Sequence, residues 1–257
     1  MDETEDISEM PHLTNKTLII TGSSRGIGRA LAVGLARQGV DLILNARSQD
    51  ALDQVFLECS EHKDGVQAVA GDISRAETVA ECVAQAEAMG NMFGFIHVAG
   101  VLHPGPFVWE LDEESFDQVM GSSVKASYLL IRHVVPALLA REGGLAVFVG
   151  SGAAEITQPG IGAYCAAKSA EERLARQLAA ETDKVTSCVF RPGIVDTQMQ
   201  EQARQAQGGG AEQVQRVFRS WKERGELITP EQSANDLIQL LKQDHATLHG
   251  KTFRAGE

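Results

Sequence analysis

The sequence is poor in cysteine, and it has no long apolar run. Its four cysteines, at positions 59, 82, 165 and 188, are scattered without any C-x-x-C spacing. We therefore expect reduced thiols, as in a cytoplasmic protein, and no zinc or other metal site. No apolar stretch approaches the roughly 20 residues that span a bilayer, so no membrane segment is predicted.

Basic residues are also scarce. The chain has 23 Lys and Arg against 35 Asp and Glu, a formal net charge of −12 at pH 7. A general nucleic-acid binder needs a basic face, so this composition argues against that class. An anionic cofactor is not excluded, because a few local arginines suffice to bind phosphate. Residues 1–14 form an acidic leader, which has the wrong charge for a secretory signal or a transit peptide, so a cytoplasmic location is expected.

Short apolar runs alternate with helical patterns along the rest of the chain. The runs predict strands at 17–20, 42–44, 66–69, 93–98, 145–149, 185–190 and 252–253, with helices near 27–36, 75–89, 113–141 and 162–182. Such alternation predicts βαβ units and a parallel sheet that is covered on both faces. Because no linker interrupts the pattern, residues 15–257 are predicted to form one doubly wound α/β domain.

The segment at about 198–228 differs from the rest. It is polar, contains three consecutive glycines at 208–210, and carries isolated Val214, Phe218 and Trp221. An insertion of this kind after the sixth strand is a candidate substrate lid. The alternative is a polar loop without fixed structure.

A glycine-rich turn lies between the first strand and the first helix, where residues 21–28 read T-G-S-S-R-G-I-G. Glycines at 22 and 26 would let the backbone turn tightly beside a pyrophosphate, and Gly28 would let the helix pack close to the sheet. The position after a predicted strand favours dinucleotide binding over a turn without a ligand.

The end of the second strand predicts the cofactor. A carboxylate there accepts hydrogen bonds from the adenosine ribose, whereas an arginine there pairs with a 2′-phosphate. Residues 44–48 read L-N-A-R-S and hold no acid. Arg47 together with Arg25 could clamp that phosphate, which favours NADP(H) over NAD(H). Alternatively, Arg47 is a solvated residue at the start of a helix.

Tyr164 and Lys168 are four residues apart on a predicted helix and therefore face the same way. A nearby ammonium stabilises a phenolate, which would make Tyr164 a general acid or base. Ser151 follows the predicted strand at 145–149, thirteen residues before Tyr164. It would lie at the carboxyl edge of the sheet, where ligands bind, and could hold a substrate oxygen beside the tyrosine.

Together these motifs resemble the short-chain dehydrogenase/reductase family of about 250 residues, over nearly the whole chain. The T-G-x-x-x-G-x-G turn, the Tyr-x-x-x-Lys pair, the upstream Ser151, Gly71-Asp72-Ile73 and the R-P-G-I-V-D-T run at 191–197 occur in the family's order. The resemblance implies a doubly wound Rossmann fold with a mostly seven-stranded parallel sheet. It also implies hydride transfer between nicotinamide and a carbonyl carbon or secondary alcohol. The implied cofactor-binding residues are Gly22, Ser24, Arg25, Gly26, Ile27, Gly28, Arg47, Asp72, Ile73, Ala99, Gly100, Tyr164, Lys168, Pro192, Gly193, Val195 and Thr197.

Two departures from the family pattern concern polar residues. The usual Asn-Asn-Ala-Gly after the fourth strand reads His97-Val98-Ala99-Gly100, so the usual asparagine contacts are expected to be lost. The catalytic-group asparagine in the following long helix is replaced by Ser123. In the family that position helps to hold a water that connects the lysine to solvent.

These residues predict a reductase of ketones, aldehydes or diketones, loosely similar to sepiapterin and benzil reductase relatives. The resemblance also implies a homodimer or homotetramer through the helices near 113–141 and 162–182. The substrate pocket is expected to be bounded by His103, Trp109, Ala153, Glu155, Pro159 and Met199. A second hypothesis is a catalytically impaired, NADP(H)-binding regulatory or scaffold protein, which only the Val98 and Ser123 departures support.

Overall fold

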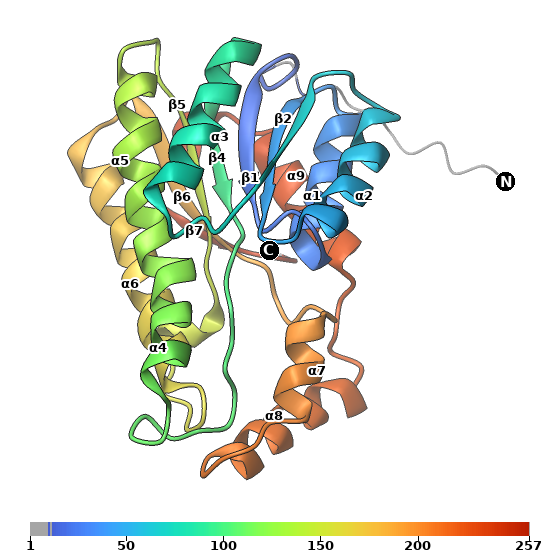
Figure 1. The fold of residues 1–257 in the computed structure, drawn as a ribbon, viewed down its shortest axis with the longest axis vertical. Coiled ribbons are helices and arrows are strands. Elements are labelled where there is room, and N and C mark those ends of the chain that lie inside the picture. The colour runs from blue at the N-terminus through green and yellow to red at the C-terminus, as the bar shows by residue number, and fades with distance from the viewer. Residues whose placement is uncertain (1–9, 11, 257) are drawn as a thin grey trace, which may run out of the picture.

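A seven-stranded parallel sheet forms the centre of the computed structural model, which describes residue 10 and residues 12–256 (Figure 1). The strands are β1 (Thr17–Thr21), β2 (Asp41–Ala46), β3 (Val66–Ala70), β4 (Met92–His97), β5 (Gly144–Val149), β6 (Val185–Arg191) and β7 (Thr252–Arg254). Their order is β3-β2-β1-β4-β5-β6-β7, and every pairing is parallel. The predicted doubly wound fold is thereby confirmed.

Helices cover both faces of this sheet. They are α1 (Gly26–Arg37), α2 (Gln49–Ser60), α3 (Ala76–Met89), α4 (Glu113–Met120), α5 (Ala126–Leu139), α6 (Gly162–Glu181), α7 (Gln198–Arg204), α8 (Ala211–Glu223) and α9 (Pro230–Leu241). Strand residues alternate between two cores. Leu18 and Ile20 pack with α1, α2 and α9, whereas Ile19 packs with α3, α5 and α6. Sequence patterning did not predict α2 or α9.

The prediction of one long α-helix near 113–141 is wrong. It divides into α4 and α5, with a π-helical turn at Gly121–Lys125 between them. Glycine and two serines stand at 121–123, and these residues stabilise a regular α-helix poorly. A π-turn inserts an extra residue and is frequent at functional sites. Here it places Ser123 in the interior.

The 198–228 segment is helical, with α7 and α8 joined by the glycine-rich loop (Figure 1).

At the N-terminus, Met10 and Leu13 are buried in the same core as α1, so the packed chain begins before residue 15. The rest of the predicted acidic leader, residues 1–9 and 11, lies outside the described residues. No helix in the described part of the chain is long and apolar enough to cross a membrane.

Candidate active site

A single large cavity opens at the carboxyl edge of the sheet, where the strand order reverses between β1 and β4. In an open α/β sheet, this switch point is where ligands bind. The cavity has a volume of about 2440 Å³, more than the roughly 300–1,000 Å³ of a drug-sized site, so it has room for a dinucleotide and a substrate together. Ser151 and all of the predicted cofactor-binding residues line it, whereas Ser123 is buried behind its wall.

The glycine turn has the geometry of a phosphate cradle. Gly26 has a φ of +53°, in the left-handed region that side chains disfavour. A Cβ on Gly28 would lie 2.2 Å from the carbonyl oxygen of Gly22, so only glycine lets α1 approach β1 this closely. No side chain caps the N-terminus of α1, which leaves its first N–H groups for an anion.

The carboxyl end of β2, where the adenosine ribose is expected to bind, carries no carboxylate. Ala46 ends the strand, and Arg47 follows it, exposed and without an ion-pair partner among the residues the structure describes. Arg25 instead donates a hydrogen bond to Gln198 at the start of α7. Both arginine side chains line the cavity, as the predicted clamp on a 2′-phosphate requires, and the clamp itself stays a prediction. Asp72 accepts from the Ser74 N–H at 2.9 Å.

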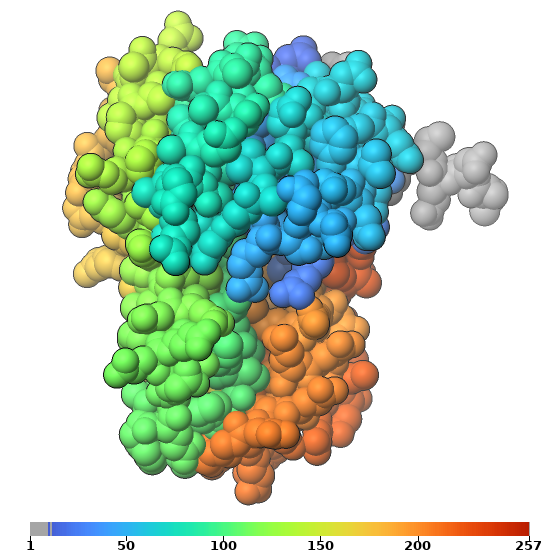
Figure 2. Space-filling view, viewed as in Figure 1, coloured from blue at the N-terminus to red at the C-terminus, as the bar shows by residue number. Residues whose placement is uncertain are grey.

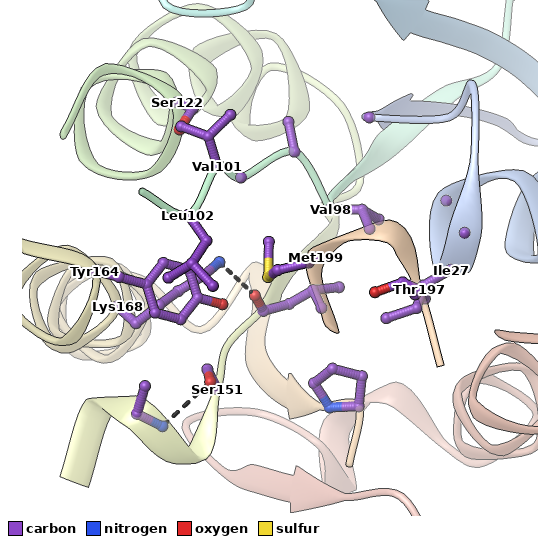
Figure 3. A pocket seen from close by; sticks show the side chains of 18 of the residues that line it. Ile27, Val98, Val101, Leu102, Ser122, Ser151, Tyr164, Lys168, Thr197 and Met199 are labelled. Atoms are coloured by element: carbon purple, nitrogen blue, oxygen red, sulfur yellow. Dashed lines mark hydrogen bonds between the residues drawn. The ribbon is translucent and has the colours of Figure 1, made fainter. Parts of the chain in front are cut away.

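Of the predicted catalytic residues, Ser151, Tyr164 and Lys168 come from the end of β5 and from α6 and line the cavity (Figure 3), whereas Ser123 lies on the π-turn and does not. Ser151 follows β5, and its Oγ accepts the Ala153 N–H at 3.1 Å, which leaves the hydroxyl hydrogen for another acceptor. Tyr164 is half-buried on α6. Lys168, one turn later, is 3% exposed, and its Nζ donates to the Val149 carbonyl at 2.8 Å.

A buried carboxylate, Glu171, also contacts Lys168. Its two oxygens lie 3.0 and 3.1 Å from Nζ, and its side chain is fully buried. Burial raises the pKa of Glu171 to about 7, against the lowering effect of the lysine. Burial alone would lower the pKa of Lys168, but Glu171, Tyr164 and Glu172 together outweigh it and leave that pKa raised. Sequence reasoning missed Glu171, although an acid three residues after the lysine on the same helix was visible.

A second buried acid joins the catalytic loop to the end of β6. The guanidinium of Arg191 donates to both oxygens of Glu172 at 2.9 and 2.7 Å, and to Glu155 at 2.7 Å. The hydrogen bond to Glu172 raises the pKa of Arg191. The Ser151 N–H lies 3.4 Å from Glu172, and Arg254 also pairs with Glu155. This network connects the serine loop to the Pro192-Gly193 turn, which follows Arg191.

The residues at the replaced asparagine positions, His97 and Val98, are hydrogen-bonded to Thr21 at the end of β1. The Thr21 hydroxyl accepts the N–H groups of Val98 and Ala99 at 3.1 and 3.2 Å, so its own hydrogen points to His97 Nδ1, 2.8 Å away. We assign the Nε2–H tautomer to His97 on this basis. Burial lowers the pKa of His97 to about 3.

The substrate end of the cavity, beside Tyr164, is apolar. Leu102, Ile161 and Phe218 belong to one buried cluster there, and Tyr164 and Met199 pack against it. Of the predicted pocket residues, His103, Ala153, Glu155 and Met199 line the cavity. Trp109, 81% exposed, and Pro159 do not. Glu155 is engaged by two arginines, so it is not a free acid that could select an amine.

A glycine turn and a Ser-Tyr-Lys group at the switch point of a doubly wound sheet are typical of oxidoreductases. Comparison with known proteins agrees, since residues 16–208 match the family model for short chain dehydrogenases. The chain therefore belongs to the short-chain dehydrogenase family.

Relatives named as reductases extend over most of the chain. An NADPH-dependent pterin aldehyde reductase of Arabidopsis thaliana is 32% identical over 72% of this chain and 76% of its own. An NADPH-dependent aldehyde reductase-like chloroplast protein of the same plant is 30% identical over 77% and 80%. Among solved structures, a Saccharomyces cerevisiae short-chain dehydrogenase/reductase has a TM-score of 0.83 at 26% identity, covering 94% of this chain and 96% of its own. The KRED1-Pglu enzyme has a TM-score of 0.82 at 26% identity, covering 92% and 99%.

Proposed function

We propose that this protein is an NADP(H)-dependent carbonyl reductase that acts on neutral, largely apolar ketones, aldehydes or diketones. The observation that carries the proposal is the arrangement of Ser151, Tyr164 and Lys168 on one wall of the cavity that also holds the glycine turn. When bound, the cofactor would supply the hydride.

Each side chain has a distinct role in this proposal. The unengaged hydroxyl hydrogen of Ser151 orients the carbonyl oxygen of the substrate. Tyr164 donates a proton to the oxygen as negative charge develops there, which is general acid catalysis. The Lys168 ammonium stabilises the phenolate that remains. Alcohol oxidation would use the same groups in reverse.

The choice of NADP(H) is supported by Arg47 and by the absence of an acid at the tip of β2. A 2′-phosphate would give Arg47 the anionic partner that it lacks within the described chain. The two Arabidopsis relatives are both named as NADPH-dependent. Comparing the KM values for NADPH and NADH tests this choice. A clear preference for NADH would contradict it.

The substrate class follows from the surface around Tyr164. The side chains there are apolar, and the nearby guanidinium groups of Arg191 and Arg254 are paired with Glu172 and Glu155. Among the described residues, the apolar cluster around Tyr164 offers a carboxylate substrate no cation. The pterin aldehyde reductase suggests one aromatic aldehyde for the substrate panel, alongside aryl ketones and vicinal diketones.

We propose that residues 198–228 act as the substrate lid of a single domain that begins near residue 15. The loop that connects α7 and α8 is docked on the segment at 105–110. In Figure 2 these two parts of the chain, coloured orange and green, meet in the lower half of the molecule. The Gly105 N–H donates to the Gly160 carbonyl at 2.7 Å, and the Gly210 N–H donates to Gly105 at 2.8 Å. Glu110 accepts from the Gly209 N–H at 2.8 Å. The structure is thus closed over the apolar end.

We also propose a cytoplasmic homodimer or homotetramer. Phe116 on α4 and Tyr128 and Leu139 on α5 expose 43%, 50% and 39% of their surface, and a second copy would cover such apolar side chains. The four cysteines are free and buried, as a reducing compartment allows. Light scattering of purified protein tests the assembly, and cell fractionation tests the location.

The decisive experiment measures NADPH oxidation by absorbance with the substrate panel. Turnover that needs both NADPH and a carbonyl supports the reductase. If NADPH binds but no compound is reduced, the chain is a cofactor-binding protein without turnover, and the proposal is wrong.

A further inference from the structure

We propose that Glu171 is a positioning residue that holds Lys168 and supplies the proton that Lys168 passes toward Tyr164. The inference rests on the proposed function, because it concerns how Tyr164 recovers its proton after reducing a carbonyl. The Glu171 carboxylate is in direct contact with the Lys168 Nζ at 3.0 Å. Both side chains are shielded from solvent by α6, the π-turn and β5.

The surroundings of Nζ leave few other sources for that proton. Nζ is bonded to the Val149 carbonyl, which cannot donate, and to the two oxygens of Glu171. Among the described residues, Glu171 is thus the hydrogen-bonded partner of Lys168 that can carry a proton.

The groups facing this pair come from every element that packs around it. On α6, Glu172 adds a like charge that favours the protonated form of Glu171. On the π-turn, the buried Ser123 hydroxyl lies near enough to lower the pKa of that carboxyl, although it meets no partner in hydrogen-bonding geometry. On β4, neutral His97 has an unpartnered Nε2 near the carbonyls of Ser122 and Ser123. Because Ser123 and His97 carry no charge, burial remains the largest influence on the pKa of Glu171 and keeps it raised.

The proton steps balance without any other reactant than water. After Tyr164 has donated its proton, Lys168 returns one to the phenolate and becomes a neutral amine. Glu171, as a carboxylic acid, then protonates the amine and becomes a carboxylate. A proton from solvent restores the carboxylic acid before the next turnover, by way of Lys168, which lines the cavity that the product has left. Because burial raises the pKa of Glu171 to about 7, both of its forms are populated near neutral pH.

The test compares Glu171→Gln with Glu171→Asp. Glutamine keeps the size of the side chain and an oxygen for Nζ but holds no acidic proton. We expect Glu171→Gln to lower kcat for carbonyl reduction at least 10-fold, with the KM for NADPH within about 2-fold of wild type. Wild-type kcat should fall as pH rises through about 7, and this limb should be absent in Glu171→Gln. Glu171→Asp, which keeps an acid, should restore part of the rate and the limb.

Glu181→Gln, on the exposed far end of the same helix, is the matched control and should behave as wild type. An unchanged pH profile in a folded, active Glu171→Gln protein would overturn the relay but leave the reductase intact.

A second readout measures the titration of Glu171 directly and does not depend on turnover. Carbon-13 NMR of glutamate-labelled, cofactor-free protein should show one carboxyl titrating near pH 7, and Glu171→Gln identifies it by its loss. If no glutamate of the wild type titrates above pH 5.5, the relay is refuted. If the carboxyl titrates as expected but the wild type reduces no carbonyl, the proposed function fails, and the relay fails with it.

Discussion

Breaking the buried ion pair between Arg191 and Glu172 should destabilise the protein severely. Their side chains are only 4% and 2% exposed, and the two hydrogen bonds measure 2.9 and 2.7 Å. Glu172→Gln leaves the guanidinium buried without its carboxylate, a change that costs about 3–5 kcal/mol. Because Arg191 keeps Glu155, we expect about 3 kcal/mol, the lower end of this range. For a domain of this size, that lowers Tm by about 6–12 °C.

Urea unfolding followed by circular dichroism gives the free energy of unfolding, and calorimetry gives Tm. Glu226→Gln is the control, because Glu226 makes a similar two-bond pair with Arg224 but on the surface, and its Tm should stay within error of wild type. Replacing both partners, Arg191→Met with Glu172→Leu, should recover much of the loss, because no buried charge is left without its partner and Arg176, which also pairs with Glu172, is partly exposed. A loss below about 1 kcal/mol in Glu172→Gln would refute the reasoning, since it would put the pair in the range of surface salt bridges.

Four further outcomes can be measured. Arg47→Ala should raise the KM for NADPH at least 10-fold and change the KM for NADH little; equal effects on both would contradict a 2′-phosphate contact. Tyr164→Phe should lower kcat by about 10²–10⁴-fold while NADPH still binds by fluorescence. Gly28→Ala should abolish NADPH binding by calorimetry, because its Cβ would lie 2.2 Å from a carbonyl oxygen. The lowered pKa of His97, about 3, means that the native state binds fewer protons than the unfolded chain. Its contribution to stability is present above pH 6.5 and is lost as pH falls from 6.5 toward 3, so His97→Asn should show a smaller loss in urea midpoint between pH 7 and 4.5.

The carboxyl-edge site was largely predictable because its motifs are local. The glycine turn needs only its place after an apolar strand, and the Tyr164–Lys168 pair needs only the helical repeat. Ser151 needs only the end of a strand. The structure places all three on one cavity, as parallel strands must, since their carboxyl ends share an edge.

Other features were not predictable from local pattern. The helix α8 does carry an amphipathic repeat, with apolar residues at 214, 217, 218 and 221, but the three glycines before it and its many polar residues favoured a loop interpretation. The loop that joins α7 and α8 is docked on Gly105, a contact that no local pattern predicts. The break between α4 and α5 was also missed, because the apolar pattern runs on through the π-turn.

The sequence by itself determined the order of the strands along the chain, the helices α1, α3 and α6, the phosphate turn, and the side chains on one face of α6. These depend on backbone preferences and on spacings of four residues or fewer. Only the tertiary structure decided which side chains surround Lys168 and which residue pairs with the buried Glu172. His97 meets Thr21 across 76 residues of chain, and Arg191 meets Glu172 across 19. Such pairings depend on strand order and helix packing, and so does the burial that raises the pKa of Glu171. For that reason the proposed proton relay could be inferred only from the folded molecule.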